Sequence, residues 1–261
     1  MAFDWDNRHP APEGSSEYFA EVDRRFFQLI EHVAHPGWPK VPPFSSLENF
    51  AALTGKKVLE IGCGAGSVAE ALARCGADLT AIDLTQRAVD LTRKRLDLAG
   101  LPANVLKMDA EEMNFPDASF DYIWSWGVIH HARKPERIVR EMYRILRPGG
   151  CFAVMLYHRR STRFWISGVL RRGVLGLQLL KKSPDDIQME FTDGFHARHY
   201  SVPDARELFS GFEVAEIRIL DMNDLAIPFH PLRKFLRPVG SEKVLGPCPR
   251  HRIPLRLVFV H

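Results

Sequence analysis

Residues 58–66 read Val-Leu-Glu-Ile-Gly-Cys-Gly-Ala-Gly, and this stretch decides the fold. Its apolar residues predict a buried strand over 57–61, its glycines predict a turn, and the residues from Ser67 predict a helix. Glycines let the backbone approach a ligand closely because they carry no Cβ. The unpaired N–H groups at the start of a helix favour a carboxylate or a phosphate. The stretch therefore predicts a small-molecule cofactor at the end of a strand, without deciding which cofactor.

The composition is that of an ordinary globular protein. The chain has 261 residues, 46% of them apolar and 26% charged, with a net charge of +3. Its four cysteines form no C-x-x-C pair and no cluster of zinc-ligand spacing, so we expect neither a metal site nor a disulfide framework. The segment 1–12 lacks the basic start and apolar core of a signal peptide, and no apolar run is long enough to cross a bilayer. We therefore expect a cytoplasmic protein.

Strand and helix patterns alternate between residues 57 and 157. Helical periodicity after Ser67, over 86–99 and over 135–146 separates apolar runs that predict strands over 57–61, 79–83, 104–107, 120–125 and 152–157. This alternation predicts an α/β fold with a Rossmann-like, mostly parallel sheet, right-handed crossovers and helices on both faces. In the second of these helices the basic residues are expected to face solvent: Arg87, Arg93, Lys94 and Arg95.

Polar residues follow the predicted strands where a ligand would bind. Ligands of parallel sheets lie outside the carboxyl ends of the strands, next to the first strand. Asp83 ends the second strand, about 20 residues after the first glycine, which suits hydrogen bonding to a ribose diol. Asp109 follows the third strand, and Ser125 ends the fourth. These positions fit a nucleoside cofactor, and both acids could instead cap the helix that follows.

Two features of the glycine stretch distinguish between nucleoside cofactors. The spacing is G-x-G-x-G instead of G-x-G-x-x-G, and Glu60 lies inside the first strand. A dinucleotide would place its pyrophosphate at the turn, where a buried acid repels it. A cofactor with a cationic amino group at the same place would be attracted. The charge therefore favours S-adenosylmethionine over NAD, and a methyltransferase over an NAD-linked oxidoreductase.

Ordered motifs across 57–157 resemble those of a known family. They are the stretch 58–66, Ala81-Ile82-Asp83-Leu84, Asp109-Ala110-Glu111, Ser119-Phe120-Asp121, Ser125-Trp126-Gly127-Val128-Ile129-His130-His131 and Leu146-Arg147-Pro148-Gly149-Gly150. In this order the chain resembles the class I S-adenosylmethionine-dependent methyltransferases. The most similar branch is typified by the quinone-biosynthesis C-methyltransferases and many small-molecule methyltransferases. A glycine turn alone is a weak signal, whereas the ordered set is specific.

The resemblance implies a division of labour within the site. The glycine turn would lie along the methionine part and the ribose, Asp83 would hold the ribose hydroxyls, Asp109 with the Ala110 backbone would contact the adenine, and the Ser125 region would face the amino-acid end. The implied cofactor residues are Glu60, Gly62, Cys63, Gly64, Gly66, Asp83, Leu84, Asp109, Ala110, Glu111, Ser125 and Trp126.

Methyl transfer from a sulfonium displaces an already activated carbon, so the protein mainly positions the acceptor and excludes water. A general base is needed only if the acceptor loses a proton as it attacks. His130 and His131, just past the fourth strand, are the candidates for that base. In the family that the chain resembles, a histidine at the position of His131 often shapes the pocket instead, so both roles remain open.

The segments outside 57–157 are expected to select the acceptor. Residues 159–182 contain seven basic residues and no acid among many apolar ones, which predicts one or two amphipathic helices. Three alternatives stay open: a cap with a solvated basic face, a cap that meets an anionic or lipid-like substrate, and a helix on a membrane surface. The candidate acceptor-contacting residues are Tyr18, Tyr157, His158, His196 and Tyr200.

The two ends of the chain complete the predicted domain. Residues 1–14 are expected to be a flexible arm, followed from Ser15 by an amphipathic helix that either packs on the domain edge or forms a lid carrying Tyr18 or Phe19. Ser201 and Asp204 predict a capped helix. Strands over 214–220 and 255–260 are expected to form an antiparallel hairpin, joined by a long connection and completing seven strands.

The sequence thus predicts one methyltransferase domain over 15–261. It comprises a cofactor core (57–157), a cap or substrate insertion (158–200), and a C-terminal helix and hairpin (201–261). It would bind S-adenosylmethionine and methylate an O, N or C nucleophile of a small molecule. The alternatives are a catalytically silent protein on the same fold and an enzyme for a lipid- or quinone-like acceptor at a membrane surface. Ser125-Trp126-Gly127-Val128 stands where amino-methylating nucleic-acid enzymes carry Asn-Pro-Pro-Tyr, which disfavours a nucleic-acid substrate. The oligomeric state stays open.

Overall fold

The computed structural model describes residues 11–29, 44, 48–159, 174, 176–182, 197–220 and 254–260. Several predictions concern residues outside these ranges: the arm up to residue 10, most of the basic segment 159–182, His196, and the connection 221–253. Within the described residues no helix is both long enough and apolar enough to cross a membrane.

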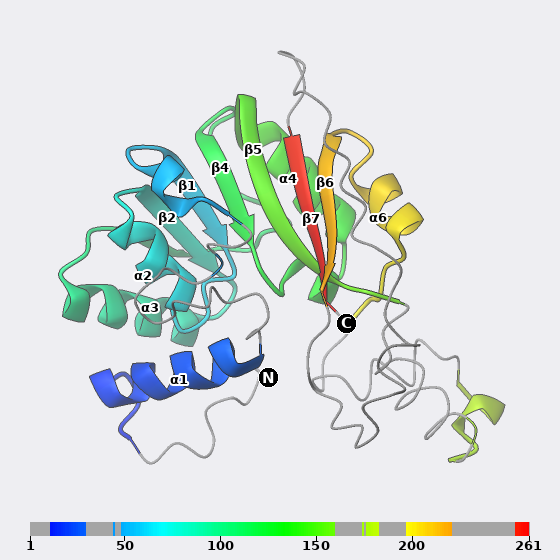
Figure 1. Ribbon diagram of the computed structural model, residues 1–261, viewed down its shortest axis with the longest axis horizontal. Coiled ribbons are helices and arrows are strands. Elements are labelled where there is room, and N and C mark those ends of the chain that lie inside the picture. The colour runs from blue at the N-terminus through cyan, green and yellow to red at the C-terminus, as the bar shows by residue number, and fades with distance from the viewer. Residues whose placement is uncertain are drawn as a thin grey trace, which may run out of the picture.

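A seven-stranded sheet forms the centre of the described structure, in the order β3-β2-β1-β4-β5-β7-β6 (Figure 1). All of its neighbouring strands run parallel, which confirms the parallel arrangement predicted for the five strands over 57–157. The order reverses between β1 and β4, so the carboxyl ends of these two strands form the switch point where ligands of such sheets bind. The strands are β1 (Lys57–Ile61), β2 (Asp78–Asp83), β3 (Asn104–Lys107), β4 (Phe120–Ser125), β5 (Leu146–Tyr157), β6 (Glu213–Leu220) and β7 (Pro254–Val260).

The last two strands correct the prediction of an antiparallel hairpin. β7 pairs parallel to both β5 and β6, with Leu255 opposite Phe152 on one side and opposite Val214 on the other. Antiparallel neighbours can be joined by a tight turn, whereas parallel neighbours need a crossover of a dozen or more residues. The connection 221–253 between the two strands is long enough for such a crossover. Its length was interpreted as a long hairpin loop, but it permits the parallel arrangement equally well.

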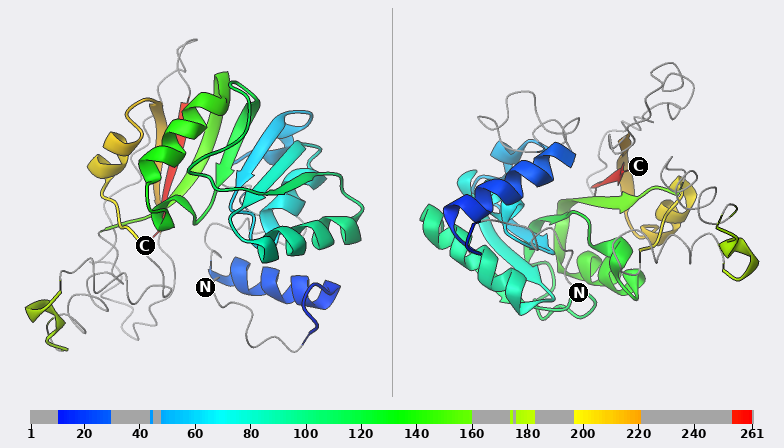
Figure 2. Two further views of the ribbon diagram at one scale, coloured as in Figure 1. Left: turned by 180° about the vertical axis from the view of Figure 1, so that it is seen from behind. Right: turned by 90° about the horizontal axis from the view of Figure 1, so that it is seen from below.

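Helices cover both faces of the sheet, as predicted. The helical elements are α1 (Ser16–Leu29), η1 (Phe50–Leu53), α2 (Ser67–Arg74), α3 (Gln86–Ala99), η2 (Ile129–His131), α4 (Pro135–Ile145), η4 (Gln178–Leu180) and α6 (Val202–Leu208). Figure 1 shows α4 behind the strands β5 and β7. Beneath α2 and α3 lies α1, which crosses that half of the molecule when it is seen from below (Figure 2).

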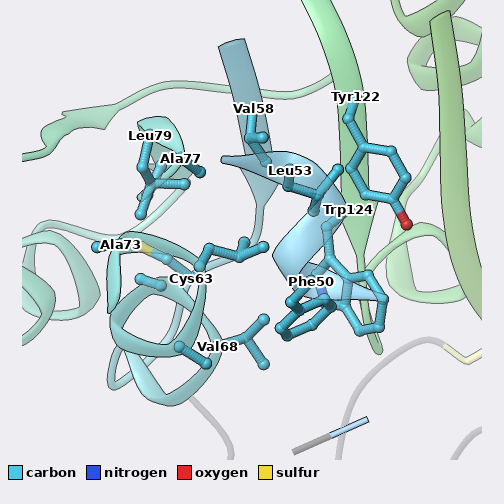
Figure 3. Close-up of a cluster of buried hydrophobic side chains, with 14 of the residues drawn as sticks. Phe50, Leu53, Val58, Cys63, Val68, Ala73, Ala77, Leu79, Tyr122 and Trp124 are labelled. Atoms are coloured by element: carbon cyan, nitrogen blue, oxygen red, sulfur yellow. The ribbon is translucent and has the colours of Figure 1, made fainter. Parts of the chain in front are cut away.

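Alternating side chains of β1 divide the core into two clusters. Val58 belongs to the cluster that includes α2 and α3, whereas Leu59 and Ile61 belong to the cluster that includes α4 and α6. Successive side chains of a strand point to opposite faces, so this buried strand contributes to both cores. Part of the first cluster is shown in Figure 3, where Phe50 of η1 lies beside Trp124 of β4 with ring centroids 5.4 Å apart.

Local signals account for two helix starts. The Ser201 hydroxyl accepts a hydrogen bond from the Asp204 N–H, and the Asp204 carboxylate accepts one from the Ser201 N–H, so the predicted capping box is confirmed. Thr85 caps α3 by accepting from the Ala88 N–H at 3.3 Å. Neither Asp83 nor Asp109 is therefore a helix cap, because Thr85 is the N-cap of α3 and Asp109 leads into a turn.

The prediction that Arg95 faces solvent is wrong. Its side chain is only 6% exposed. Arg95 lies one turn after Leu91 on α3, so helical spacing turns it to the same buried side. Burial of the charge is offset by ion pairs with Asp23 and Glu70, which no short-range pattern in the sequence indicates.

Candidate active site

The glycine turn connects the carboxyl end of β1 to α2 at the switch point. The N–H groups of Gly62 and Cys63 both donate to the Ile82 carbonyl, at 2.8 and 3.1 Å, which fastens the turn to β2. Gly62, Gly64 and Gly66 have φ values of +81°, +54° and +80°, a region that favours glycine. The turn therefore has this shape because three of its positions carry no side chain.

The three glycines of this turn serve different purposes. A Cβ on Gly62 would lie 2.1 Å from Cγ2 of Val128, and one on Gly66 would lie 3.2 Å from Cδ of Arg95. These two glycines therefore allow protein parts to approach each other. A Cβ on Gly64 would meet nothing within 4 Å. Gly64 is thus the position of the turn whose Cβ direction is open, and the space beside it fits the close approach of a ligand.

Asp83, at the end of β2, holds the turn in place. Its Oδ2 accepts a hydrogen bond from the Gly64 N–H at 3.1 Å, and its Oδ1 accepts from both the N–H and the hydroxyl of Thr85, at 2.9 and 3.0 Å. The carboxylate thus joins the glycine turn to the start of α3. Next to it, the apolar side chain of Leu84 is 64% exposed and so lies at the surface beside this polar turn.

The third strand ends in a second polar turn. Oδ1 of Asp109 accepts a hydrogen bond from the Glu111 N–H at 2.8 Å, and Oε1 of Glu111 accepts from the Lys134 N–H at 2.9 Å. Asp109 is exposed, while Ala110 and Glu111 are half-buried. The turn is therefore fixed to the segment before α4, and the Asp109 carboxylate reaches the surface at the carboxyl end of the sheet.

Glu60 is a buried acid inside β1. It is 3% exposed, and its Oε2 has no hydrogen-bond partner among the described residues. Burial raises the pKa of the Glu60 carboxyl well above its usual range, the charge of Asp83 raises it further, and that of Arg95 lowers it. Burial also raises the pKa of the neighbouring Cys63 thiol, which keeps that sulfur neutral. An unpartnered buried carboxyl fits a cation or a hydrogen-bond donor supplied by a bound molecule.

At the end of β4, Ser125 and Trp126 complete the cofactor side. Ser125 is 1% exposed, and within the described part of the chain its hydroxyl oxygen has no hydrogen-bond partner. The Trp126 ring stacks on Trp124 at 5.7 Å and contacts Phe44 at 4.4 Å between centroids. Ser125 is in register with Ile61 and Glu60 with Trp124, so the two unpartnered oxygens lie on opposite faces of the sheet, both near the carboxyl ends of the two central strands and the open position at Gly64. This arrangement fits the cofactor that the sequence predicts.

Aromatic rings from distant parts of the chain gather beyond β5. The His130 ring lies 3.9 Å from the Tyr157 ring and 4.2 Å from the His131 ring, between centroids. The Tyr157 ring also lies 5.6 Å from that of His199, with an angle of 29° between their planes. These four residues are called the ring cluster below. His131, Tyr157 and His199 are half-buried, so part of each remains accessible.

The two adjacent histidines of the ring cluster differ in their environment. His130 is fully buried. Burial lowers the pKa of the His130 imidazole well below its usual range, and the charges of His131 and His199 lower it further. A neutral imidazole that resists protonation is a weak proton acceptor. Of the two candidates for a general base, the geometry therefore favours His131.

Main-chain hydrogen bonds bring His199 to the ring cluster. The Arg198 N–H donates to the His130 carbonyl at 2.8 Å, and the Tyr200 N–H donates to the Tyr157 carbonyl at 2.9 Å. His158 and Tyr200 thereby form a parallel bridge. His199 was not among the candidate residues of the sequence. This pairing joins positions far apart in the chain, so the sequence does not reveal it. The one signal for His199 in the sequence was its position next to Tyr200, which was a candidate acceptor-contacting residue.

The remaining candidates lie elsewhere. Tyr18 is 1% exposed and packs with Phe19 and Leu91, in a cluster separate from the two main ones. His158 and Tyr200 are buried beside the end of β5, and His196 lies outside the described residues. In the ranges that the structure describes, no three His, Cys, Asp or Glu side chains are grouped to hold a metal ion.

Known proteins are similar to this region in sequence and in fold. Residues 59–154 match the family model described as a methyltransferase domain. The ubiquinone biosynthesis O-methyltransferase of Cupriavidus pinatubonensis is 27% identical over 227 residues, which cover 82% of this chain and 86% of that protein. The protein of the same name from Pseudomonas aeruginosa is 27% identical over 182 residues, 65% of this chain and 77% of its own.

A solved structure supports the same architecture. The SAM-dependent methyltransferase structure from Methanosarcina mazei superimposes with a TM-score of 0.51 at 24% identity, covering 61% of this chain and 81% of that one. At this level of identity the likeness concerns the fold: an α/β unit whose parallel strands run in the order 3-2-1-4-5.

Proposed function

The chain is a class I S-adenosylmethionine-dependent methyltransferase, distantly related to the ubiquinone biosynthesis O-methyltransferases, and from this premise we propose that it methylates a hydroxyl group of a planar small molecule held at the ring cluster. The observation that carries the proposal is the meeting of two environments at one end of the sheet. A polar cofactor side lies over β1 to β3, and the ring cluster lies beyond β4 and β5.

On the cofactor side, we assign the ribose to Asp83 and the adenine to the turn after β3. A carboxylate has about four acceptor positions, and the hydrogen bonds from Gly64 and Thr85 leave room for one ribose hydroxyl at Asp83. A second ribose hydroxyl would take the place of the Thr85 hydroxyl hydrogen, which can turn away from Asp83 while the Thr85 oxygen still caps α3. The exposed Leu84 offers an apolar surface to the adenine, next to Asp109 and Ala110.

The amino-acid end of the cofactor belongs, in this proposal, near the carboxyl ends of β1 and β4. Glu60 and Ser125 supply the unpartnered buried oxygens there. When bound, the cofactor supplies an activated methyl group, so the chain itself needs no nucleophile. A positive ammonium near Glu60 would favour the ionised carboxylate and so oppose the burial that raises its pKa.

On the acceptor side, the chain must hold a ring and receive a proton. Tyr157 and His199 stack on each other with 29° between their planes, and a planar molecule bound against the half-buried His199 ring would extend this stack. A hydroxyl acceptor loses its proton as it attacks, and His131 is the partly accessible base of the ring cluster. His130, buried and neutral, would orient His131 by ring contact at 4.2 Å. The names of the two relatives support an oxygen acceptor instead of the carbon acceptors of the branch that the sequence resembles.

A lipid- or quinone-like acceptor at a membrane surface is a second candidate. Around η4 the apolar side chains of Leu177, Leu179 and Leu180 are 67%, 37% and 79% exposed, and Lys181 and Lys182 follow. Exposed apolar residues beside basic ones favour contact with an anionic lipid surface. Binding of the protein to vesicles that contain anionic lipid, and not to neutral ones, is the result that this second candidate predicts.

The experiment that tests the proposal incubates the protein with methyl-labelled S-adenosylmethionine and fractionated cell extract. We expect label in a small aromatic product whose mass has increased by one methyl substitution, and none with Asp83→Ala. Cofactor binding without any labelled product would identify a catalytically silent protein. Label in a product without an aromatic ring would contradict the role given to the ring cluster.

A further inference from the structure

The N-terminal helix α1 is tied to the first residue of α2. The Asp23 carboxylate, on α1, accepts a hydrogen bond from the Ser67 hydroxyl at 2.7 Å and pairs with Nη2 of Arg95 at 2.5 Å. The Asp23 side chain is 19% exposed, so this contact is largely shielded from water. Such charge-assisted bonds are stronger than neutral ones when they are shielded.

Arg95 extends the hydrogen-bond network of Asp23 to the glycine turn. Its Nε donates to Glu70 at 2.6 Å, and its Nη1 donates to the Ser67 hydroxyl at 3.2 Å and to the Ala65 carbonyl at 3.5 Å. Ala65 and Ser67 flank Gly66 of the turn. One guanidinium group therefore contacts α1, α2 and the turn, using the planar fork of donors that a lysine does not have.

The position of Asp23 also satisfies a local need of α2. The N-cap of α2 is Gly66, which provides no side-chain hydrogen bond. The positive end of the helix favours an anion, and a carboxylate from α1 lies at its first residue. In dinucleotide-binding proteins that place receives the pyrophosphate. Here a residue of the chain itself supplies the negative charge.

A second contact links α1 to the other side of the site. The Phe26 ring of α1 lies 6.1 Å from the Phe44 ring, which in turn lies 4.4 Å from the Trp126 ring after β4. α1 thus contacts the segments at the carboxyl ends of both central strands: the turn after β1 through Asp23, and Trp126 through Phe44. Its position beneath this half of the molecule is visible in Figure 1 and Figure 2.

We propose that Asp23 and Arg95 are positioning residues that couple the docking of α1 to the shape of the glycine turn, so that cofactor binding and α1 docking strengthen each other. The inference rests on the proposed cofactor site at the turn. If a docked α1 raises the affinity for the cofactor by some factor, the bound cofactor must stabilise the docked α1 by the same factor. The affinity for the cofactor thereby depends on α1, a helix far from the glycine turn in the sequence.

The test compares Asp23→Asn with the wild type by calorimetry, using S-adenosylhomocysteine as the probe. We expect roughly tenfold weaker binding, within the range of allosteric couplings. In wild-type protein the probe should slow amide hydrogen exchange in α1, and in Asp23→Asn this protection should be lost. Arg95→Lys should recover part of the affinity that Arg95→Met loses, because lysine keeps the charge without the fork.

The matched control is Glu13→Gln. Glu13 pairs with Arg87 at 3.0 Å and so connects the segment before α1 to α3. The Glu13 and Arg87 side chains are 52% and 40% exposed, and neither residue belongs to the glycine turn. Its affinity for the probe should stay within twofold of wild type. Equal binding by Asp23→Asn and wild type, or equal weakening by Glu13→Gln, would overturn the coupling.

Two further outcomes separate this inference from the proposed function. If Asp23→Asn does not fold, Ser67→Ala removes the hydroxyl that joins Asp23 and Arg95 but keeps the ion pair between them, and the same loss of affinity and protection is expected. If wild-type protein does not bind the probe at all, the proposed cofactor site fails together with the coupling. Binding by wild type with unchanged α1 exchange overturns the coupling alone.

Discussion

The two sides of the site are held together in different ways. On the cofactor side, carboxylates accept hydrogen bonds from main-chain N–H groups two residues further along the chain, as Asp83 does from Thr85 and Asp109 from Glu111. On the acceptor side, His130, Tyr157 and His199 come together from three distant segments through ring contacts. Short-range hydrogen bonds suit a site whose ligand, the cofactor, stays the same. A site built from distant segments can change the acceptor that it binds when one of those segments changes.

The difference is useful because it separates stability from catalysis. A substitution on the cofactor side should alter folding or cofactor affinity, and one in the ring cluster should alter turnover with the cofactor still bound. Two substitution pairs test this division, and a pH titration shows where a buried ring of the ring cluster, His130, also affects stability. The three tests follow from the largest expected effect to the smallest.

The largest effect is expected within the glycine turn. Gly62→Ala places a Cβ against Val128 at a φ of +81°, so overpacking adds to backbone strain and unfolding should become easier by about 3 kcal/mol. Gly64→Ala meets open space and should cost about 1 kcal/mol of stability while weakening cofactor binding. Urea denaturation and calorimetry separate the two outcomes. Shortening the obstructing side chain in Gly62→Ala/Val128→Ala should restore part of the stability; no restoration would mean that the clash is not the cause.

The next effect concerns the proton acceptor of the ring cluster. Removing a general base typically lowers a rate by a factor of about 10² to 10⁴, so His131→Asn should lower kcat about a hundredfold with cofactor affinity unchanged. Glu136→Gln, at an exposed position at the start of α4, serves as the control and should keep full kcat. Steady-state rates with saturating cofactor measure both. A His131→Asn enzyme with wild-type kcat would show that the acceptor needs no proton removed by the chain.

The smallest effect is a pH dependence of stability at His130. Because burial holds the pKa of this imidazole below its usual value of about 6.5, the unfolded chain takes up a proton there before the folded chain does. Stability conferred by the neutral ring is complete above pH 6.5 and declines as the pH falls below it, by at most about 1.4 kcal/mol per pH unit. Urea denaturation of wild type and His130→Asn between pH 5 and 8 should show a steeper decline for wild type; identical slopes would contradict the buried neutral state.

The cofactor half of the fold is readable from the sequence because its signals are local. The predicted bounds of β1, β3, β4 and α3 agree with the structure, as does the capping box of Ser201 and Asp204. Apolar runs, turn glycines and cap residues act over a few positions, and local patterns are the kind of information that a single sequence contains.

Three failures involve contacts between distant positions. Arg95 was expected outside because a charged residue on a helix usually is; the ion pairs with Asp23 and Glu70 that allow its burial join positions on three helices. The direction of β7 was predicted wrongly, as antiparallel. The direction of a strand depends on the path of the chain that connects it to its neighbour, and the residues of the strand do not reveal that path. His199 was missed because its place in the ring cluster results from pairing with the end of β5.

The central claim is that the cofactor is held at the glycine turn through Asp83, and calorimetric titration with S-adenosylhomocysteine tests it most directly. Removing charge-assisted hydrogen bonds costs roughly 1.5–3 kcal/mol, so Asp83→Asn should bind at least about tenfold more weakly than wild type. Asp90→Asn, whose carboxylate accepts from Gln86 on the exposed face of α3, should bind like wild type. Equal affinity for wild type and Asp83→Asn would contradict the assignment of the site.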